Sequence, residues 1–294
     1  MAYSHILVGA STSLAQPVVR RISPSDLYQS LARGIEDFTA MPSHALFLCV
    51  IYPLLGVFLI AITVGNSLLP LAFPIAAGFA LIGPLAAIGL YELSRRREAG
   101  LDSSSSHALD VLHSPSLGAI IALGVLLMAI FLIWLAVADA IYIASFGYHG
   151  PASIRQFAVD VLTTGAGWQL IVVGTGVGFL FAVLVLTIGA ISFPLLLDRD
   201  VGAAVALLTS MRVVALNPGT MALWGFIVAA LLVLGSIPFF LGLTVVMPVL
   251  GHATWHLYRR AVEPDANPHP DYQPRERRRR YAADFPSALF PTRE

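Results

Sequence analysis

The residues that could carry chemistry in this chain are few, and most of them are histidines near the ends of predicted helices. His252 and His256 are four residues apart, which places them on one face of a helix. His44 and His113 stand at the starts of two other predicted helices. Neutral imidazole binds copper, zinc and haem iron. A convergence of these side chains would therefore offer a haem or copper site, with Glu92 as a carboxylate beside the imidazoles.

The same histidines also have a simpler interpretation. His252 and His256 are flanked by Trp255, Tyr258 and Arg259, and this mixture is typical of a helix end at the membrane–water boundary. There, aromatic rings lie in the interface and polar tips reach water. We predict that these histidines are interfacial anchors and that no cofactor is bound, with haem or copper binding as the alternative.

Other sources of chemistry are weak. Cys49 is the single cysteine, so the chain can form neither an internal disulfide nor a cysteine-based zinc site. The glycine-rich run at 174–178 lies in an apolar segment with no strand before it. We interpret four glycines, Gly165, Gly167, Gly174 and Gly178, as small residues that let helices approach closely. No catalytic residue is predicted, and we expect no enzymatic activity of the chain's own.

Composition decides the class of protein. The chain has 294 residues, of which 57% are hydrophobic and 12% charged, and its mean hydropathy is +0.80. Soluble domains carry roughly 25% charged residues, so this composition excludes an ordinary cytosolic enzyme and indicates an integral membrane protein. The expected fold is all-α, a polytopic bundle of transmembrane helices.

Six apolar runs are long enough to cross the roughly 30 Å hydrocarbon core. They lie near 43–66, 69–93, 116–145, 168–197, 220–236 and 237–258, and the last two are separated at Gly235, Ser236 and Pro238. All 17 basic residues are arginine. The segments between spans alternate between the two sides of the membrane, and all arginines but Arg155 lie in segments on the same side. The positive-inside rule then places both termini in the cytoplasm of a bacterial cell, with the spans in its inner membrane.

Two of these spans share a pattern, P-x3-G-x5-P-x10-RR, which suggests an internal repeat. Both helices would run from outside to inside. The pattern consists of Pro74, Gly78, Pro84, Arg95 and Arg96 in the second span. These residues are matched in the sixth span by Pro238, Gly242, Pro248, Arg259 and Arg260.

Amphipathic stretches precede the three spans that leave the cytoplasm, at 26–39, 105–112 and 201–216. The first puts Leu27, Leu31, Ile35 and Phe38 on one face, which suits the bilayer interface. A further amphipathic stretch at 151–164 is expected on the far membrane face. The simplest architecture is three units, each a cytoplasmic interfacial helix followed by an out-and-back hairpin.

The termini are expected to add little structure. We divide the chain into a flexible N-terminus (1–24), a six-span membrane domain (25–262) and a disordered tail (263–294) rich in arginine and proline. Arg275 and Arg277–Arg280 in the tail would be attracted to anionic lipids, and we predict no nucleic-acid binding.

Several segments in order resemble one family. The sequences at 31–56, 192–219 and 241–260, with the proline-rich second span, are similar to the DUF2189 family of bacterial integral membrane proteins. The resemblance covers roughly residues 21–262. It implies no established activity, although some members carry a putative cytochrome c oxidase subunit label. A catalytic oxidase subunit needs histidines in the middle of its spans, including an adjacent pair, and this chain has neither.

These observations favour a non-enzymatic membrane accessory or scaffold protein whose partners are lipids, anionic ones included, and other membrane proteins such as respiratory complexes. One alternative is an accessory factor of a respiratory cytochrome c oxidase that handles haem or copper. Another is a carrier or pore for a neutral solute, since the spans offer hydroxyl groups but no charge at the midplane.

Overall fold

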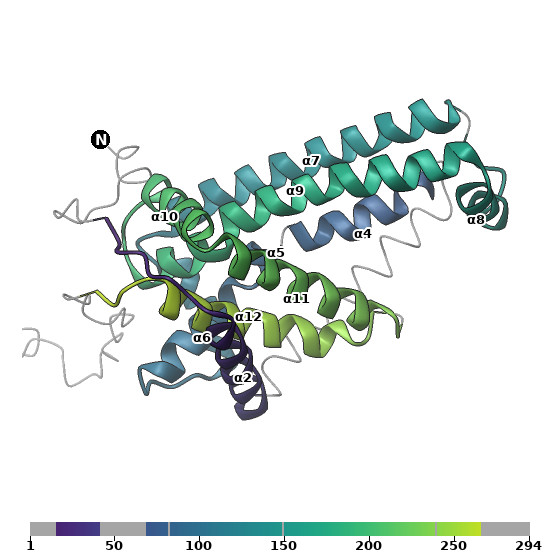
Figure 1. Cartoon of the computed structure of the whole chain (residues 1–294). Coiled ribbons are helices and arrows are strands. Elements are labelled where there is room, and N and C mark those ends of the chain that lie inside the picture. The colour runs from purple at the N-terminus through teal and green to yellow at the C-terminus, as the bar shows by residue number, and fades with distance from the viewer. Residues whose placement is uncertain (1–15, 42–68, 82, 149, 239, 266–294) are drawn as a thin grey trace, which may run out of the picture.

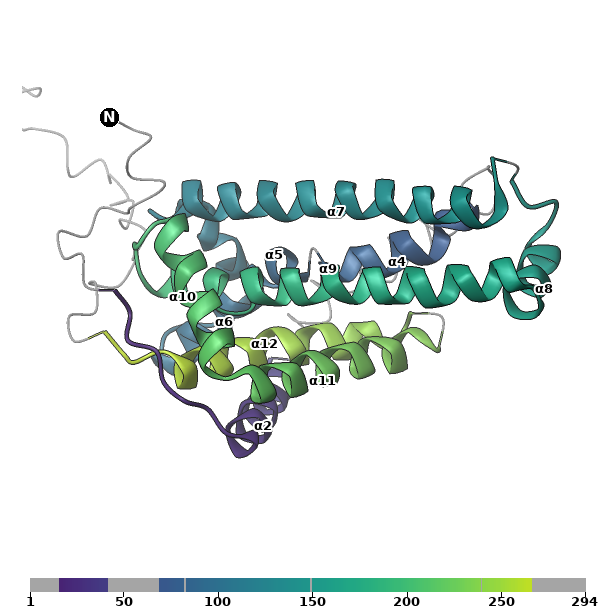
Figure 2. The same cartoon turned by 45° about the horizontal axis from the view of Figure 1, so that its top comes forward.

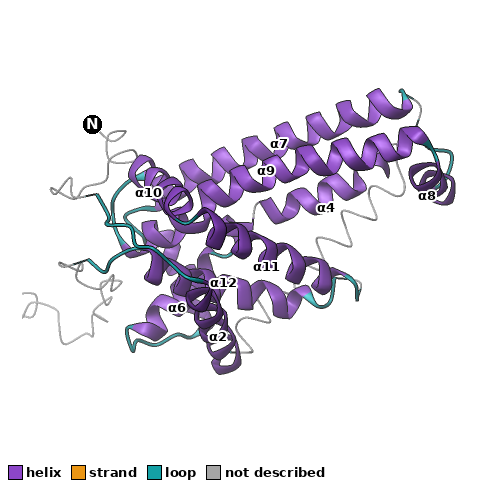
Figure 3. Ribbon diagram, in the orientation of Figure 1, coloured by secondary structure: helices purple, strands orange, loops and turns teal. Residues whose placement is uncertain are grey.

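The computed structural model describes residues 16–41, 69–81, 83–148, 150–238 and 240–265. Every element assigned in these ranges is a helix (Figures 1 and 3). The helices are α2 (Pro24–Ala40), η1 (Leu69–Leu71), α4 (Ala72–Leu81), α5 (Gly83–Ala86), α6 (Ile88–Glu98), η2 (Ser105–His113), α7 (Leu117–Phe146), α8 (Ile154–Thr163), α9 (Gly165–Asp198), α10 (Ala203–Leu216), α11 (Pro218–Ser236) and α12 (Leu243–Ala261).

Among the described helices, three are long and apolar enough to cross a membrane: α7, α9 and α11. They coincide with the spans predicted at 116–145, 168–197 and 220–236. At about 1.5 Å per residue, the 30 residues of α7 and the 34 of α9 exceed the hydrocarbon thickness, so both must extend beyond it. The first predicted span, 43–66, lies outside the described residues.

The other two predicted spans differ from expectation. Residues 69–93 do not form one helix but are divided among η1, α4, α5 and α6. Pro74 and Pro84 lie in this stretch, and proline lacks the N–H that a continuous helix needs. The sixth span was expected to begin at 237, but α12 begins at Leu243, after a turn in which Phe240 has a positive φ of 65°. The predicted break is present, because α11 ends at Ser236.

One end of the bundle gathers the short amphipathic helices. Figures 1 and 2 show α2, α6 and α10 near one end of the long helices and α8 at the other. There the returning helices α6, α9 and α12 contact one another, and each also packs against one amphipathic helix: α6 against η2, α9 against α10, α12 against α2. The last described helix thus packs onto the first described one. We call this end, with α2, α6, η2, α10 and the C-terminal halves of α9 and α12, the polar end.

Further along the bundle, Trp134 of α7 joins α4 to α9. Its indole N–H donates to the carbonyl of Pro74 (2.9 Å), and its ring lies against Phe181 and Gly178. The packing role predicted for glycines is confirmed at Gly178 and at Gly167, which lies against the backbone of α8. At the other two glycines, Gly165 and Gly174, an added Cβ would have no described atom within 4 Å.

The expectation of a flexible N-terminus is wrong for residues 16–23. Val19 pairs with Val262 in a short antiparallel bridge, flanked by hydrogen bonds from Arg20 N to Ala261 O (2.8 Å) and from Glu263 N to Val18 O (2.9 Å). Glu263, assigned above to the disordered tail, is therefore part of the fold. Residues 1–15 and 266–294 lie outside the described residues.

Candidate functional site

The site is built on α2, whose start is set locally. The Ser23 N–H donates to the Asp26 carboxylate (2.8 Å), and Pro24 occupies the first helical position, where its missing N–H costs nothing. The helix then buries one face against α12, which consists of Leu27 and the small or polar residues Ser30, Gly34 and Asp37. Gly34 allows the close approach, because a Cβ there would lie 2.7 Å from backbone atoms of α12. This contact carries Asp37 into the interior of the polar end.

Asp37 collects hydrogen bonds from two other helices. Its Oδ2 accepts from the Ser94 hydroxyl on α6 (2.6 Å) and from Nε2 of His256 on α12 (2.9 Å). Its Oδ1 accepts from the Arg97 guanidinium. His252 lies behind Ser94, with Nδ1 2.7 Å from the hydroxyl and 4.0 Å from Asp37 Oδ2. We call Asp37, Ser94, Arg97, His252 and His256 the Asp37 centre.

The hydrogen-bond pattern fixes one tautomer. Ser94 has a single hydroxyl hydrogen, which the short contact assigns to the charged carboxylate of Asp37. Ser94 must then accept from Nδ1–H of His252, which leaves Nε2 of that ring as the unprotonated nitrogen. Within the described part of the chain, this Nε2 is buried and has no hydrogen-bond partner. The result is a continuous chain of hydrogen bonds from His252 through Ser94 and Asp37 to His256.

Apart from Arg97, the residues of the Asp37 centre are enclosed by protein. The exposed fractions are 0% for His252, 1% for Ser94, 5% for Asp37 and 7% for His256. Burial opposes the charged form of Asp37, but the hydrogen bonds that its carboxylate accepts from His256 and Ser94 are the largest of the effects that outweigh it. The pKa of Asp37 is therefore held below its usual value.

This pKa shift predicts a pH dependence of stability. A carboxyl group whose pKa is lowered by folding stabilises the fold above its unfolded pKa of about 4, and that contribution is lost as the pH falls through the lowered folded value. Thermal unfolding in detergent, followed at several pH values, measures this effect. At neutral pH the unfolding temperature of the wild type should lie well above that of Asp37→Asn. The gap should narrow below about pH 4. A gap that stays constant with pH would contradict the assignment.

Of the predicted cofactor-binding residues that the structure describes, His252 and His256 are the two that come together. His252 and His256 share the Asp37 centre, but both are buried, so the prediction that they are interfacial anchors with wet tips is wrong for them. Trp255 and Tyr258, each 1% exposed, are also interior. His113 is exposed at the end of η2 and takes no part, and His44 lies outside the described residues.

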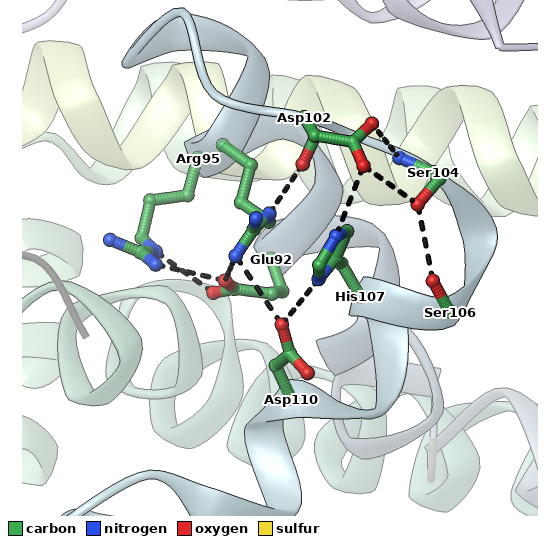
Figure 4. A network of polar contacts seen from close by, with 8 residues as sticks. Glu92, Arg95, Asp102, Ser104, Ser106, His107 and Asp110 are labelled. Atoms are coloured by element: carbon green, nitrogen blue, oxygen red, sulfur yellow. Dashed lines mark hydrogen bonds and ion pairs between the residues drawn. The ribbon is translucent and has the colours of Figure 1, made fainter. Parts of the chain in front are cut away.

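Glu92 was expected to supply the carboxylate beside the imidazoles, but it belongs to a second network (Figure 4). Its two oxygens accept from the Nε and Nη2 of Arg95, each at 2.8 Å. In the same network, His107 of η2 lies between Asp110 (2.6 Å) and Asp102 (3.2 Å). Arg96 joins the two parts, since its guanidinium lies 4.0 Å from Glu92 and donates to Asp110 (3.3 Å). The network therefore holds η2 against α6, which is a structural task, and the carboxylate that the imidazoles meet is Asp37.

The arginines of the proposed repeat make comparable contacts. Arg96 pairs with Asp110 of η2 (3.3 Å), and its counterpart Arg260 pairs with Asp26 of α2 (2.9 Å). Each therefore ties a returning helix to an amphipathic helix. Gly242 packs against the backbone of Gly235. The repeat itself stays a prediction.

The geometry of the Asp37 centre does not resemble a metal site. Both imidazoles are directed to the same hydrogen-bonded system, His256 through Nε2 and His252 through Nδ1. Across the described ranges, no group of three or more His, Cys, Asp or Glu side chains is placed to hold a metal ion. What the arrangement can do is bind α2 to α6 and α12 through one charged group.

Part of the chain matches a known protein family. Residues 72–198 match the DUF2189 family model. The family is described as a predicted integral membrane protein, and the match confirms the resemblance found in the sequence. No curated protein and no solved structure matches the chain. The match and the three long apolar helices identify an integral membrane protein.

The DUF2189 match spans α4 to α9, and so contains Ser94 and Arg97 but not Asp37 or the two histidines. Sequence reasoning missed Asp37 and Ser94. One signal was available for Asp37: it continues a helical stripe with Ser30 and Gly34, and small residues at that spacing mark a close helix contact. Nothing in the sequence distinguishes Ser94 from other hydroxyl residues.

Proposed function

We propose that the protein is a multi-pass inner-membrane protein with six spans and with its polar end and both termini in the cytoplasm. The distribution of arginine supports this orientation. Arg155, the one basic residue in a segment on the opposite side, lies on α8, at the end of the bundle far from α2, α6 and α10 (Figure 2). The other described arginines belong to segments at the polar end, as the positive-inside rule requires of the cytoplasmic side.

The role that the geometry supports best is that of a non-enzymatic accessory or scaffold for other membrane proteins. The observation that carries it is the uncovered apolar surface of the two longest helices. Among the 18 consecutive residues that are most apolar in each helix, only 33% are buried within the chain in α7 and 11% in α9. Phe179 and Leu180 of α9 and Phe226 of α11 are each more than 60% exposed.

The polar groups support the same role. Several carboxylates and arginines of the polar end are paired with one another, as in Asp37–Arg97, Glu92–Arg95 and Asp26–Arg260. Such pairs join helices and stabilise their arrangement, and their mutual satisfaction leaves little of the reactive, perturbed chemistry that marks an active site. Packing between helices therefore accounts for the charged groups of the polar end, and contact with neighbouring proteins accounts for the exposed apolar surface of the long helices.

Photo-crosslinking in native membranes tests the scaffold role. A photoreactive phenylalanine analogue at Phe179 or Phe226 should give discrete adducts with one or a few membrane proteins. The same analogue at Tyr148, which is 87% exposed but follows the end of α7, is the matched control and should give none of them. Adducts with lipid alone at both test positions would contradict the scaffold role. Haem or copper purifying with the crosslinked partner would favour the respiratory accessory role.

A further inference from the structure

Helix α2 has three distinct faces. At 100° per residue, the buried stripe of Leu27, Ser30, Gly34 and Asp37 centres on one direction. Beside it runs an apolar stripe of Tyr28, Leu31, Ile35 and Phe38, in which Tyr28 is 75% and Ile35 47% exposed. The remaining surface is polar and includes Gln29, Arg33 and Glu36. A helix packed on protein along one face and divided into apolar and polar strips elsewhere fits a boundary between lipid and water.

Helix α10 shows the same division more sharply. Its buried face consists of Ala203, Ala206, Thr209, Ser210 and Val213. Its exposed face is apolar along its whole length, formed by Ala204, Leu208, Met211 and Ala215, with Arg212 at the edge. Leu208 is 48% and Met211 45% exposed. In water this helix would present an unbroken apolar strip.

The level of α10 along the bundle can be placed from its contacts with α9. Ser210 Oγ accepts from the backbone N–H of Ile191 (3.3 Å), and the Ser192 hydroxyl contacts the carbonyl of Ala206 (3.1 Å). The exposed Trp168 marks the other end of α9, as tryptophan does at membrane interfaces. From Trp168 to Ile191 the helix rises about 35 Å, and the hydrocarbon core is about 30 Å thick. The α10 helix therefore lies at the opposite boundary of that core.

Helix α2 starts at the same level. Asn217, which follows α10, accepts from the Ile22 N–H (2.8 Å) and donates to the Arg20 carbonyl (3.0 Å). The Thr220 hydroxyl donates to the Ile22 carbonyl (3.1 Å). The segment that leads into α2 is thus fixed to the end of α10 and the start of α11.

We propose that the apolar strips of α2 and α10 form one docking surface for the bilayer itself, seated at the boundary between acyl chains and headgroups of the cytoplasmic leaflet. This inference rests on the proposed membrane orientation and names the partner of the polar end. Arg21 and Arg33, both exposed, lie on the same segment as the α2 strip and suit anionic headgroups. Since α2 also carries Asp37, one rigid helix links the lipid surface to the buried Asp37 centre.

Quenching of site-specific fluorophores tests the docking surface. The full chain with Cys49→Ser would carry a single cysteine at Ile35 or Met211, labelled with an environment-sensitive dye. It would be reconstituted in vesicles of phosphatidylethanolamine and phosphatidylglycerol. Lipids brominated near the top of the acyl chain should lower fluorescence about twofold at both positions, while aqueous iodide should have little effect. A cysteine at Glu36, on the polar strip of α2, is the matched control and should show the reverse.

Two results would overturn the proposal. Iodide quenching at Ile35 and Met211 as strong as at Glu36 would place the strips in water. Protection from both quenchers would mean that protein, such as a second copy of the chain, covers them. Either result leaves the crosslinking test of the scaffold role unaffected, so failures of the two proposals can be told apart. If the Met211 variant does not fold, Leu208→Cys reads the same strip of α10.

Discussion

The Asp37→Ala variant is expected to lose about 3 kcal/mol of folding stability, because it leaves Ser94, Arg97 and His256 without their common acceptor. Removing one partner of a buried charged group costs more than the pair itself contributes, since the remaining groups stay desolvated. Arg97 is 39% exposed and can turn to water, which keeps the loss from being larger. Thermal unfolding of the detergent-purified protein, followed by tryptophan fluorescence, measures the change.

Glu36→Ala is the matched control. Glu36 precedes Asp37 on the same helix but is exposed, and its side chain has no ion pair with a described residue. Its loss should therefore change stability by less than about 0.5 kcal/mol. Asp37→Asn, which keeps the shape but removes the charge, should fall between the two. Equal unfolding temperatures for the Asp37→Ala and Glu36→Ala variants would show that the Asp37 centre does not hold α2 in place.

Gly34→Ala is expected to have a comparable effect through sterics alone. A single methyl group at this position would lie 2.7 Å from Ala253 N and from Val249 O, which are backbone atoms and cannot turn away. The two helices must therefore separate, which loosens the Asp37 centre as well, and we expect a loss of about 2–3 kcal/mol. The measurement is again thermal unfolding, together with protease sensitivity of α2.

Gly174→Ala provides the opposite case in another helix interior. No described atom lies within 4 Å of a Cβ added there, so the substitution should leave stability unchanged or raise it by up to about 1 kcal/mol, as alanine does in a helix. If both glycine substitutions had the same effect, the close approach of α2 and α12 would not be the cause of the loss at Gly34.

Much of the architecture was determined by the sequence itself. Apolar runs of the right length predict α7, α9 and α11, and the break near Pro238 follows from helix-breaking residues. The amphipathic stretches at 26–39 and 201–216 coincide with α2 and α10. These features depend on local composition and periodicity, which each segment carries by itself. For that reason they could be predicted without knowing which helices become neighbours.

Only the tertiary structure decided which polar groups meet. The residues around His252 and His256 are those expected at a membrane boundary, yet both histidines are buried because α2 packs over them. The same packing brings Asp37, which is 219 residues away in the sequence, to His256. That contact is made by the small and polar face of α2, whereas hydropathy periodicity identifies its apolar strip. A close helix crossing depends on which side chains are absent, as at Gly34, and on backbone atoms of a distant segment. The sequence of α2 alone contains no information about that segment.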